Sequence, residues 1–554
     1  MPRRIAIVHF ALCLLFSAPL FSHASDLLIH NVNGYTFTQG SDAIARFDQL
    51  LIRNGKVVST DPAVINAQVN DQTPRLNGRG KTLLPGLIDA HGHLEALGSL
   101  IETVDLRASQ SAQAAASAVA AFSDKNPDAQ VILGRGWNQE NWPDQRFPEA
   151  SVLDGLNLDK PIVLLRVDGH ALWVNSVALT LAGITAKTPD PNGGQIVRDP
   201  SGKATGILVD TAMELVKEKL PGADNQVLDR QLSLAYQHLL SLGVTGVHDA
   251  GVEPQTERML RQHAKAGTLP IRVYAMLKGS DPGLAARLKK GKVRGDFLRV
   301  QSVKIYADGA LGSRGATLIN DYADETGNKG LAITGPKALK RQFQMVQKHG
   351  FQIAVHAIGD QANRDVLDTF ATLASPRALA KHRHRVEHAQ VIAPEDLSRF
   401  ASLNIIASMQ PTHATSDRVM AIKRLGDNRL DGAYAWSSLL ASGARMAFGS
   451  DFPVEPANPF YGIHAAATRQ DRDNQPVDGW RMQDAVDVAT ALRLFTRDAA
   501  YAAHWEKDTG TLEPGKWADF IVIDTNPFTT LPDYLWQIEV EQTWVAGKPV
   551  WQQP

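Results

Sequence analysis

Cysteine is nearly absent from the sequence. The 554 residues contain one, Cys13, which lies in an N-terminal segment that we predict to be removed from the mature protein. A mature chain without cysteine can form no disulfides and offers no thiolate to a metal ion. Any metal site must therefore use histidine, aspartate, glutamate or a modified lysine.

An excess of charge of one sign is also missing. The 57 lysines and arginines nearly balance the 58 aspartates and glutamates, which gives a formal net charge of −1. A protein whose main partner is nucleic acid or an anionic membrane is expected to be basic. The balance argues against both as the main partner.

The N-terminus has the features of a targeting segment. Arg3 and Arg4 precede an apolar stretch over residues 5–21, and the small residues of 22–24 follow it. This order predicts a signal peptide over residues 1–24, cleaved after Ala24. A membrane anchor is the weaker alternative, because the stretch is short for a span and is broken by polar residues and proline. The predicted location is therefore the bacterial periplasm or the secreted fraction.

Internal repeats and low-complexity segments are absent, and the middle of the chain alternates between strands and helices. Helical patterns such as residues 339–348 and 363–373 separate several apolar or β-branched runs. Eight such runs are expected to be strands: Leu84–Ala90, Val244–His248, Ile271–Met276, Val300–Tyr306, Gln352–His356, Arg385–His388, Ile405–Met409 and Arg445–Phe448. Strands that alternate with helices predict an α/β fold with a parallel sheet, and eight of them predict a closed (β/α)₈ barrel.

Two further regions flank or interrupt this barrel, which is predicted to span residues 85–504. Short strands and turns over residues 26–84 and 505–554 predict one small β-sandwich domain built from both termini, with a hairpin at Asn54-Gly55. The gap between the first two runs is too long for a loop, so about residues 100–235 are predicted to form an inserted α/β subdomain.

Two histidines follow the first predicted barrel strand. His91 and His93 are spaced by one residue, and on an extended chain such residues point the same way. Two neutral imidazoles can then bind one metal ion, at the strand end where the active sites of such barrels lie. An isolated His-x-His pattern is more often a coincidence, and His382-Arg383-His384 is predicted to be such a case on the solvated surface.

Three more candidate ligands end other predicted strands. His356 ends the fifth run, His388 ends the sixth, and Asp451 follows the eighth. Each alone would more often be structural than catalytic. The carboxyl ends of all barrel strands meet at one rim. These three residues and the His91/His93 pair therefore predict one functional site together.

Lys304 lies within the fourth run, where an ammonium group is unfavourable. If its neutral amine captures carbon dioxide, the resulting carbamate is an anion with two oxygens that can bridge two metal ions. The alternative is an ion pair with Asp308 or Glu387, and spacing alone leaves both readings open.

These residues also carry a resemblance to a known family. The set resembles the amidohydrolase superfamily, and more narrowly its YtcJ-like (amidohydrolase 3) branch, which includes the N-substituted formamide deformylases. The motifs concerned are His91-x-His93, Lys304, His356, His388, Asp451, residues 134–138, residues 302–314 and residues 510–519. The resemblance covers nearly all of the mature chain in order.

The resemblance implies a metal-dependent hydrolase of C–N bonds in amides, formamides or cyclic amides, usually with two zinc ions. It implies that His91, His93 and Asp451 bind one ion, that His356 and His388 bind the second, and that carboxylated Lys304 bridges them. Asp451 is then the catalytic acid and base. Other divalent transition metals stay open because the ligand types accept them, and a homodimer is compatible with the resemblance.

Four residues are candidates for binding the substrate. Trp137 could wall a pocket or pack the insertion, and His170 could orient the substrate or be structural. Asp308 and Arg314 follow a strand end, where they could contact the substrate or cap a helix. The competing function is a catalytically inactive periplasmic binding or regulatory protein on the same fold, but the complete ligand set favours the hydrolase.

Overall fold

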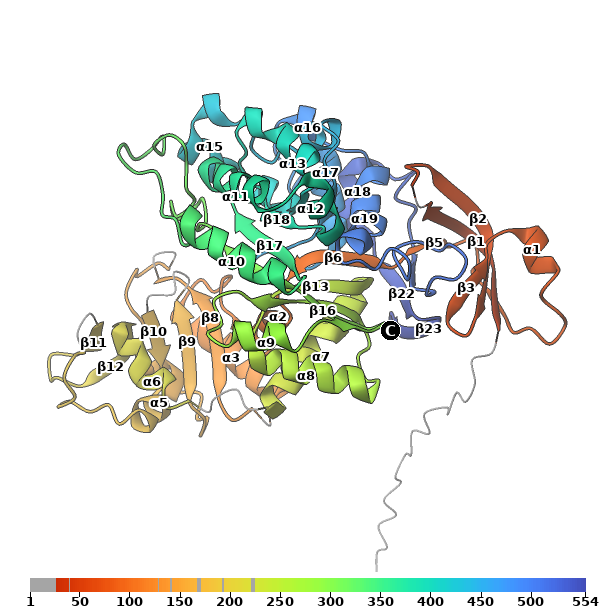
Figure 1. Ribbon diagram of the computed structural model, residues 1–554. Helices are drawn as coiled ribbons and strands as arrows, with labels where there is room; N and C mark the ends of the chain where they lie inside the picture. Colours follow the sequence, from red (N-terminus) through yellow and green to blue (C-terminus); the bar gives the residue numbers. More distant parts are fainter. Residues whose placement is uncertain are drawn as a thin grey trace, which may run out of the picture.

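The computed structural model describes residues 26–38, 40–127, 129–139, 142–166, 171–191, 194–220 and 225–554. The predicted signal peptide, residues 1–24, lies outside this part of the chain. Three sheets are present in it, with eight, six and nine strands. Figure 1 shows the sheet of the two termini on the right, the six-stranded sheet at lower left and the barrel between them. In the described residues, no helix has the length and apolar character needed to cross a membrane.

Eight parallel strands form the barrel. They are β6 (Leu87–Gly92), β13 (Val244–Val252), β14 (Arg272–Lys278), β16 (Leu298–Tyr306), β17 (Gln352–Ala357), β18 (Arg385–His388), β19 (Ile406–Met409) and β20 (Met446–Phe448). Each pairs in parallel with its neighbours in this order, and the short β15 (Val293–Arg294) adds antiparallel to β16. The predicted runs are therefore confirmed as the strands of a nearly closed parallel barrel.

Helices connect these strands. They are α2 (Leu94–Ile101), α7 (Asn225–Ser241), α8 (Pro254–Ala266), α9 (Leu284–Lys289), α10 (Pro336–Lys348), α11 (Asp360–Leu373), α12 (Pro376–His382), η3 (Pro394–Asp396), α13 (Leu397–Leu403), α14 (Pro411–Ser416), α15 (Arg418–Leu425), η4 (Asp427–Arg429), α16 (Trp436–Ala441), α17 (Pro459–Thr468), η5 (Met482–Asp484), α18 (Val488–Leu494) and α19 (Arg497–Ala502). In α10 the buried residues Leu339, Phe343 and Val346 follow the spacing of one helical face. This stripe packs inward on the barrel core, as the apolar period predicts.

Strands from both ends of the chain share the eight-stranded sheet. They are β1 (Leu27–Phe37), β2 (Ile44–Arg53), β3 (Lys56–Ser59), β4 (Arg75–Asn77), β5 (Thr82–Pro85), β21 (Phe520–Ile523), β22 (Val540–Val545) and β23 (Lys548–Gln552), with α1 (Pro62–Asn66) and η6 (Pro532–Gln537) in the connections. The hairpin at Asn54-Gly55 is confirmed, with φ of 53° and 74° at its two central residues. Positive φ at both positions is what a two-residue turn between twisted strands requires.

The first predicted barrel run is wrong at its start. Leu84 belongs to β5 in the terminal sheet, where it pairs with Ile521, and the barrel strand begins at Leu87. Gly86 separates the two strands. A Cβ at this position would lie 2.3 Å from Oγ1 of Thr245, so only glycine lets the chain pass this close to β13.

The six-stranded sheet lies between β6 and β13 in the sequence. Its strands are β7 (Val104–Asp105), β8 (Ile132–Trp137), β9 (Ile162–Arg166), β10 (Ala171–Val174), β11 (Gly194–Arg198) and β12 (Ala204–Asp210), and its helices are α3 (Ala112–Lys125), α4 (Ala150–Asp154), α5 (Ser176–Leu181), η2 (Thr211–Met213) and α6 (Glu214–Lys217). This sheet has its own apolar cluster, which includes Trp137, Trp142 and Trp173.

A buried ion pair fixes the terminal sheet to the barrel. Arg272 of β14 donates to both carboxylate oxygens of Asp519, at 2.6 and 2.8 Å, and both side chains are about 1% exposed. Asp519 also accepts hydrogen bonds from Thr509 and from the backbone of Ala546. The carboxylate therefore has its hydrogen-bonding capacity filled from three segments of the chain.

Replacing Asp519→Ala is expected to lower the free energy of unfolding by about 3–5 kcal/mol, because Arg272 would stay buried without a counter-charge. Urea denaturation followed by circular dichroism measures the change. The control is Asp105→Ala, which removes an exposed partner of Arg107 and is expected to cost about 1 kcal/mol or less. Equal effects of the two variants would contradict a special role for the buried pair.

Candidate metal centre

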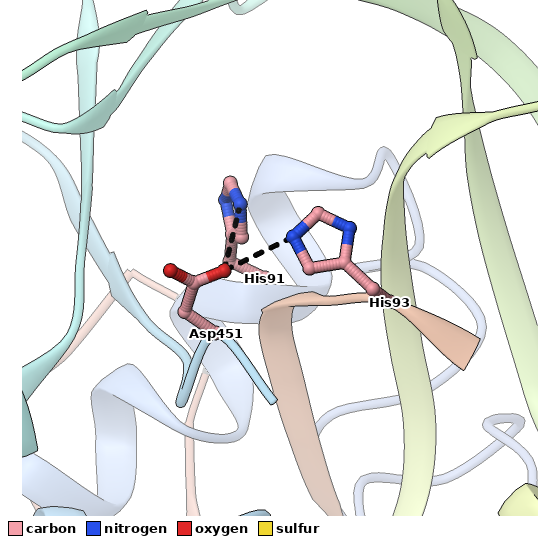
Figure 2. Close-up of side chains that lie close together, drawn as sticks. All are labelled: His91, His93 and Asp451. Atoms are coloured by element: carbon pink, nitrogen blue, oxygen red, sulfur yellow. Dashed lines mark hydrogen bonds and ion pairs between the residues drawn. The ribbon is translucent and has the colours of Figure 1, made fainter. Parts of the chain in front are cut away.

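The strongest candidate site lies where the first and last barrel strands end. His91 and His93 leave β6, and Asp451 follows β20. Oδ1 of Asp451 lies 3.1 Å from Nε2 of His93 and 3.6 Å from Nε2 of His91 (Figure 2). The ligand atoms of these three residues lie within 4.8 Å of one another, as metal ligands must. The predicted convergence of His91, His93 and Asp451 is therefore present in the structure.

Asp89 holds the two strand ends together. Its carboxylate accepts hydrogen bonds from the backbone of His91 at 3.0 Å, from the backbone of Ser450 and from the Ser450 hydroxyl at 2.6 Å. The next residue, Asp451, donates its backbone N–H to the carbonyl of His91 at 2.7 Å and has a φ of 64°. These bonds fix the left-handed backbone that places the Asp451 carboxylate between the histidines.

A left-handed backbone also positions His388. Arg385 and Glu387 lie two residues apart in β18, and both bond to the strand that carries His91. Side chains alternate along an extended strand, so an extended His388 would point away from His91. His388 instead has a φ of 72°. Its ring lies 4.8 Å from that of His91 and 4.5 Å from that of His356, centroid to centroid. The turn thus brings the histidine into the group of imidazoles.

Lys304 lies among these residues with its ammonium group buried. Its Nζ is 3.1 Å from Nε2 of His91, and burial lowers its pKa to about 8. Glu387 pairs with Arg385 and His91, while the oxygens of Asp308 accept backbone hydrogens. Within the described residues Lys304 forms no direct ion pair with either carboxylate, although the charge of Glu387 partly offsets the effect of burial on the pKa of Lys304.

His413 is a candidate ligand that the sequence analysis missed. It lies in α14, four residues beyond β19, and its Nε2 is 3.7 Å from Oδ2 of Asp451. His388, His413 and Asp451 form a second group whose ligand atoms lie within 4.8 Å. His413 neither ends a predicted strand nor directly follows one. Its location in the first turn of the helix after the seventh strand is the sequence feature that could have indicated it.

The imidazoles of the site are suited to bind a metal ion. Burial lowers the pKa of His91 to about 4 and that of His356 to about 3, and it holds that of His388 well below its usual range. These rings are therefore neutral near pH 7, the form in which they ligate metals. Among the described residues, Nε2 of His356 and Nε2 of His413 are buried without a hydrogen-bond partner. Imidazole nitrogens and a carboxylate suit zinc or a similar divalent ion.

The Asp451 carboxylate is held in its ionised form. Burial alone would raise its pKa, but the hydrogen bond from His93 and the neighbouring imidazoles hold that pKa well below the usual range. An ionised carboxylate is the form that binds a cation.

A buried carboxylate orients His91 from behind. Oε2 of Glu387 lies 2.5 Å from Nδ1 of His91, which leaves Nε2 of the ring for the site. Glu387 is in turn bonded to Arg385, whose guanidinium also reaches the carbonyl of Ala90 and Nδ1 of His248. Such a carboxylate behind a histidine fixes its ring orientation and raises its basicity.

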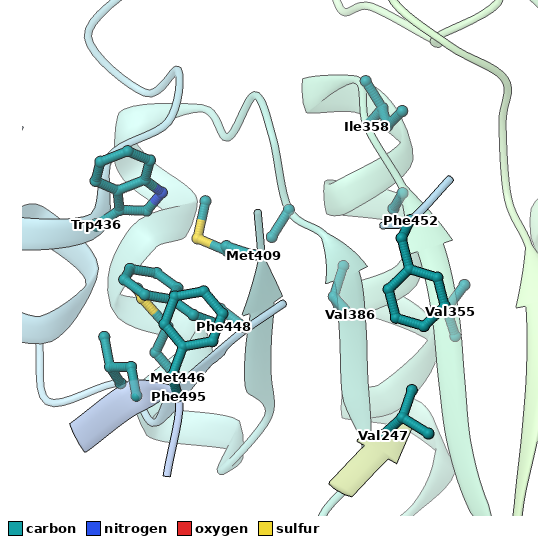
Figure 3. Packing of buried hydrophobic residues seen from close by; sticks show 14 of the residues in the cluster. Val247, Val355, Ile358, Val386, Met409, Trp436, Met446, Phe448, Phe452 and Phe495 are labelled. Atoms are coloured by element: carbon teal, nitrogen blue, oxygen red, sulfur yellow. The ribbon is translucent and has the colours of Figure 1, made fainter. Parts of the chain in front are cut away.

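Apolar side chains pack around the strands that carry these residues. Figure 3 shows Met446, Phe448 and Phe495 close together, beside Met409 and Trp436. The ring of Phe448 lies 5.7 Å from that of Trp436 and 5.7 Å from that of Phe495. Close packing of this kind limits the movement of the strands that carry the candidate ligands.

Three of the four predicted substrate residues lie in the described part of the chain and have contacts of their own, and Asp308 also lies 3.7 Å from Nε2 of His356. Trp137 is fully buried in the inserted sheet and donates to the carbonyl of Leu164, which favours its packing role. Asp308 accepts three backbone hydrogens, which gives it a structural task. Arg314 pairs with Asp324 and Glu325. His170 lies outside the described residues.

The prediction that His382-Arg383-His384 lies on the solvated surface is partly wrong. His384 is not on the solvated surface: it is fully buried, its Nδ1 accepts the backbone N–H of Ile353, and its ring stacks on Phe370 at 5.2 Å. The pattern nevertheless lies before β18 and away from the candidate ligands, so it remains separate from the site.

A cavity adjoins His93. It has a volume of about 490 Å³, and its lining includes His93, Glu95, Leu133, Asp249, Val252 and Glu253. Volumes of about 300–1,000 Å³ are typical of sites for small molecules.

A parallel barrel whose strand ends carry a His/Asp cluster is the architecture of metal-dependent hydrolases. Residues 76–551 match the Amidohydrolase family, so the chain belongs to that family. Over 92% of this chain and 99% of the other, it superposes on an uncharacterized metal-dependent hydrolase from Pyrococcus horikoshii with a TM-score of 0.75 and 26% identity. The predicted resemblance is therefore confirmed.

Three relatives align with the chain over most of its length. The chain is 34% identical to the protein LONG AFTER FAR-RED 3 of Arabidopsis thaliana, over 95% of this chain and 92% of that one. It is 32% identical to YtcJ of Bacillus subtilis, named as an amidohydrolase, over 87% and 91% of the two chains. It is 27% identical to the N-substituted formamide deformylase of Arthrobacter pascens, over 94% and 97%.

Replacing Glu387→Gln is expected to weaken zinc binding roughly 10–100-fold, because the carboxylate behind His91 loses its charge. Zinc affinity is measured by competition with a chromophoric chelator. The control is Glu257→Gln, a buried glutamate that pairs with Arg261 and Arg287 away from the site. Unchanged zinc affinity in the Glu387 variant would show that the contact with His91 does not matter for the metal.

Proposed function

We propose that the protein hydrolyses C–N bonds of small amide-like molecules with the help of bound metal. The observation that carries the proposal is the convergence of His91, His93 and Asp451 within 4.8 Å at the mouth of the barrel. The family supports hydrolysis, and a relative named N-substituted formamide deformylase supports the formamide or amide class.

His91, His93 and Asp451 would hold one zinc ion, or another divalent transition metal. A second ion beside His388 is part of the proposal, and the resemblance gives it His356 and carboxylated Lys304 as further ligands. Zinc bound there would lower the pKa of water and polarise the substrate carbonyl. The neutral imidazoles support this assignment because no proton has to leave them before they bind an ion.

Asp451 is the proposed general base and acid. Its carboxylate would take a proton from water as the water oxygen bonds to the carbonyl carbon. It would return that proton to the nitrogen as the C–N bond breaks. Its location between two imidazole groups supports the role, since each of its oxygens faces a different side of the site.

Carboxylation of Lys304 is also proposed. Its neutral amine would form an N–C bond with carbon dioxide and lose one proton, which leaves a carbamate anion. Burial supports this step, because a pKa of about 8 leaves a substantial share of the amine neutral near pH 7–8. A carbamate would also replace a positive charge that repels metal ions.

The chain organisation belongs to the same proposal. We take residues 26–84 and 505–554 as a β-sandwich domain, about 100–235 as an inserted subdomain and 1–24 as a signal peptide for export to the periplasm or beyond. The cavity beside His93 supports a small-molecule substrate. An inactive binding protein is not favoured, because the candidate ligands are all present.

Removing metal is expected to abolish hydrolysis. The mature protein, purified without chelator and with bicarbonate present, should contain transition metal by elemental analysis. It should release amine from a panel of N-formyl and N-acyl compounds. Dialysis against a chelator should remove activity and zinc should restore it. Protein that binds no zinc even after resupply would overturn the proposed function.

Replacing Asp451→Asn is expected to lower turnover roughly 10²–10⁴-fold, the usual share of a general acid–base. The rate is measured at saturating zinc on the best compound of the panel, and metal content is measured on the same sample. The control is Asp417→Asn, an aspartate bonded to Gln390 and Tyr434. A near-normal rate in the Asp451 variant would exclude the proposed role.

A further inference from the structure

The cavity beside His93 lies between the barrel and the inserted sheet. On the barrel side its lining comes from α2, α7, β13 and the start of α8, and on the other side it includes Leu133 of β8. The volume of this cavity is about 490 Å³. Because His93 is a candidate metal ligand, a group that fills the cavity would belong to a molecule bound next to the metal centre.

The lining of this cavity carries negative charge. Glu95, Asp249 and Glu253 line it, and no lysine or arginine of the described residues does. Lys278 pairs with Glu253. The side-chain contacts of Glu95 and Asp249 within the described residues are hydrogen bonds from a hydroxyl and from a backbone N–H, so neither charge is paired with a lysine or arginine. The lining therefore has an excess of negative charge that a bound cation would offset.

Asp249 is the most deeply buried of the three carboxylates. It is 4% exposed and yet lines the cavity. In the part of the chain that the structure describes, its side chain accepts one hydrogen bond, on Oδ1, from the backbone of Leu94 at 3.1 Å. Its Oδ2 is thus left for a donor. A buried carboxylate is costly unless it is paired and hydrogen-bonded, so a ligand that brings a cationic donor would be stabilised here.

Glu95 keeps its charge without a cation because of its place in the fold. It lies in the first turn of α2, where the helix dipole stabilises a carboxylate. The hydroxyl of Thr256 donates to its Oε2 at 2.5 Å, which fixes the side chain at the wall of the cavity. A purely structural role in the helix would leave the choice of substrate unchanged when this charge is removed, so experiment can separate the two roles.

The three carboxylates do not form a metal site. None of them belongs to a group of described residues whose ligand atoms converge within 4.8 Å. They are spread over a lining that is also partly apolar, with Leu133 and Val252 among its residues. Separate carboxylates on a partly apolar wall suit an organic cation with a hydrocarbon chain better than a compact metal ion.

We propose that this cavity binds a positively charged amine on the nitrogen substituent of the substrate. The preferred substrates are then amides or formamides in which a short hydrocarbon chain links the C–N bond to an ammonium group. The inference rests on the proposed function, because it names the substrate class of that site. The ammonium group donates to Glu95 and to Oδ2 of Asp249, and the hydrocarbon chain lies against Leu133. Hydrogen bonds between charged partners are roughly twice as strong as those between neutral ones.

Three matched formamides test this preference on the zinc-loaded full mature chain. N-(aminobutyl)formamide carries an ammonium group, N-pentylformamide has a methyl group in its place, and N-(carboxybutyl)formamide has a carboxylate. We expect kcat/KM for the cationic compound to exceed that for the neutral one roughly 10–100-fold, as one hydrogen bond to a charged group allows. The anionic compound should be the poorest, and high salt should reduce the difference. Longer and shorter chains of each type cover the length of the cavity.

Variants connect the preference to the cavity. Glu95→Gln keeps the side-chain size and is expected to reduce the ratio of the cationic to the neutral kcat/KM about tenfold. Glu95→Asp keeps the charge and should retain more of the preference. The control is Glu541→Gln, which removes the partner of Lys81 and does not line the cavity. Because a ratio is measured, a general loss of activity or of metal cancels. Circular dichroism checks folding, and the wild-type salt dependence tests the charge without any variant.

The outcomes separate this inference from the function on which it rests. Equal kcat/KM values for the cationic and neutral compounds at every chain length would overturn the inference and leave the hydrolase intact. A preference for the anionic compound would do the same, and so would a cationic preference that Glu95→Gln leaves unchanged. Zinc-loaded protein that hydrolyses none of these compounds and no member of the wider N-formyl and N-acyl panel would refute the proposed function itself.

Discussion

The candidate site depends on how the barrel closes. β6 and β20 are the ends of the strand order, and an isolated parallel bridge between Gly92 and Phe452 joins the segments that follow them. Asp89 completes the closure through its hydrogen bonds to His91 and Ser450. A Cβ on Gly449 would lie 2.4 Å from the backbone nitrogen of His91, so the two strand ends approach as closely as glycine allows. This approach places His91 and His93 beside Asp451, which lies 360 positions after His91 in the chain. Interactions between residues close in sequence could not bring them together.

Closure alone would not keep polar groups inside the barrel. Isolated buried charges are costly unless they are paired and hydrogen-bonded. Glu387 and Arg385 meet this requirement because each contacts the other, and the remaining bonds go to His91, His248, Ala90 and Ser408. Burial alone would raise the pKa of Glu387, but the charge of Arg385 together with His91 and Lys304 holds it well below its usual range. A buried network in which both charged groups are paired and hydrogen-bonded restricts the movement of its members. It gives the barrel interior a fixed polar framework on which the ligand rings are oriented before any ion binds.

Periodicity predicted most of the barrel, because strand spacing and strand-end chemistry are local properties of the sequence. The convergence of His91, His93 and Asp451 followed from the rule that parallel strands end at one rim. Other features depend on tertiary contacts and could not be read locally. Leu84 continues the apolar run into β6, and only the steric contact at Gly86 moves it to another sheet. Trp137 lies in a polar-looking loop sequence, yet its burial depends on Trp142 and Trp173 from other segments. His413 was missed because its direction depends on how α14 begins after β19.

The backbone at the ligands shows how function departs from the simplest strand geometry. His388, Ala389 and Asp451 have φ of 72°, 45° and 64°, a region that side chains other than glycine rarely adopt. Such residues cost of order 1–3 kcal/mol each and persist only where the surroundings determine them. Here the backbone bond from Asp451 to His91 and the contact of His388 with Gln410 supply that determination. If these residues were extended, their side chains would continue to alternate between the two faces of the strand. At least one ligand would then point away from the mouth of the barrel. The left-handed turns and the bonds that hold them are therefore a condition for bringing Asp451 and His388 to the same point.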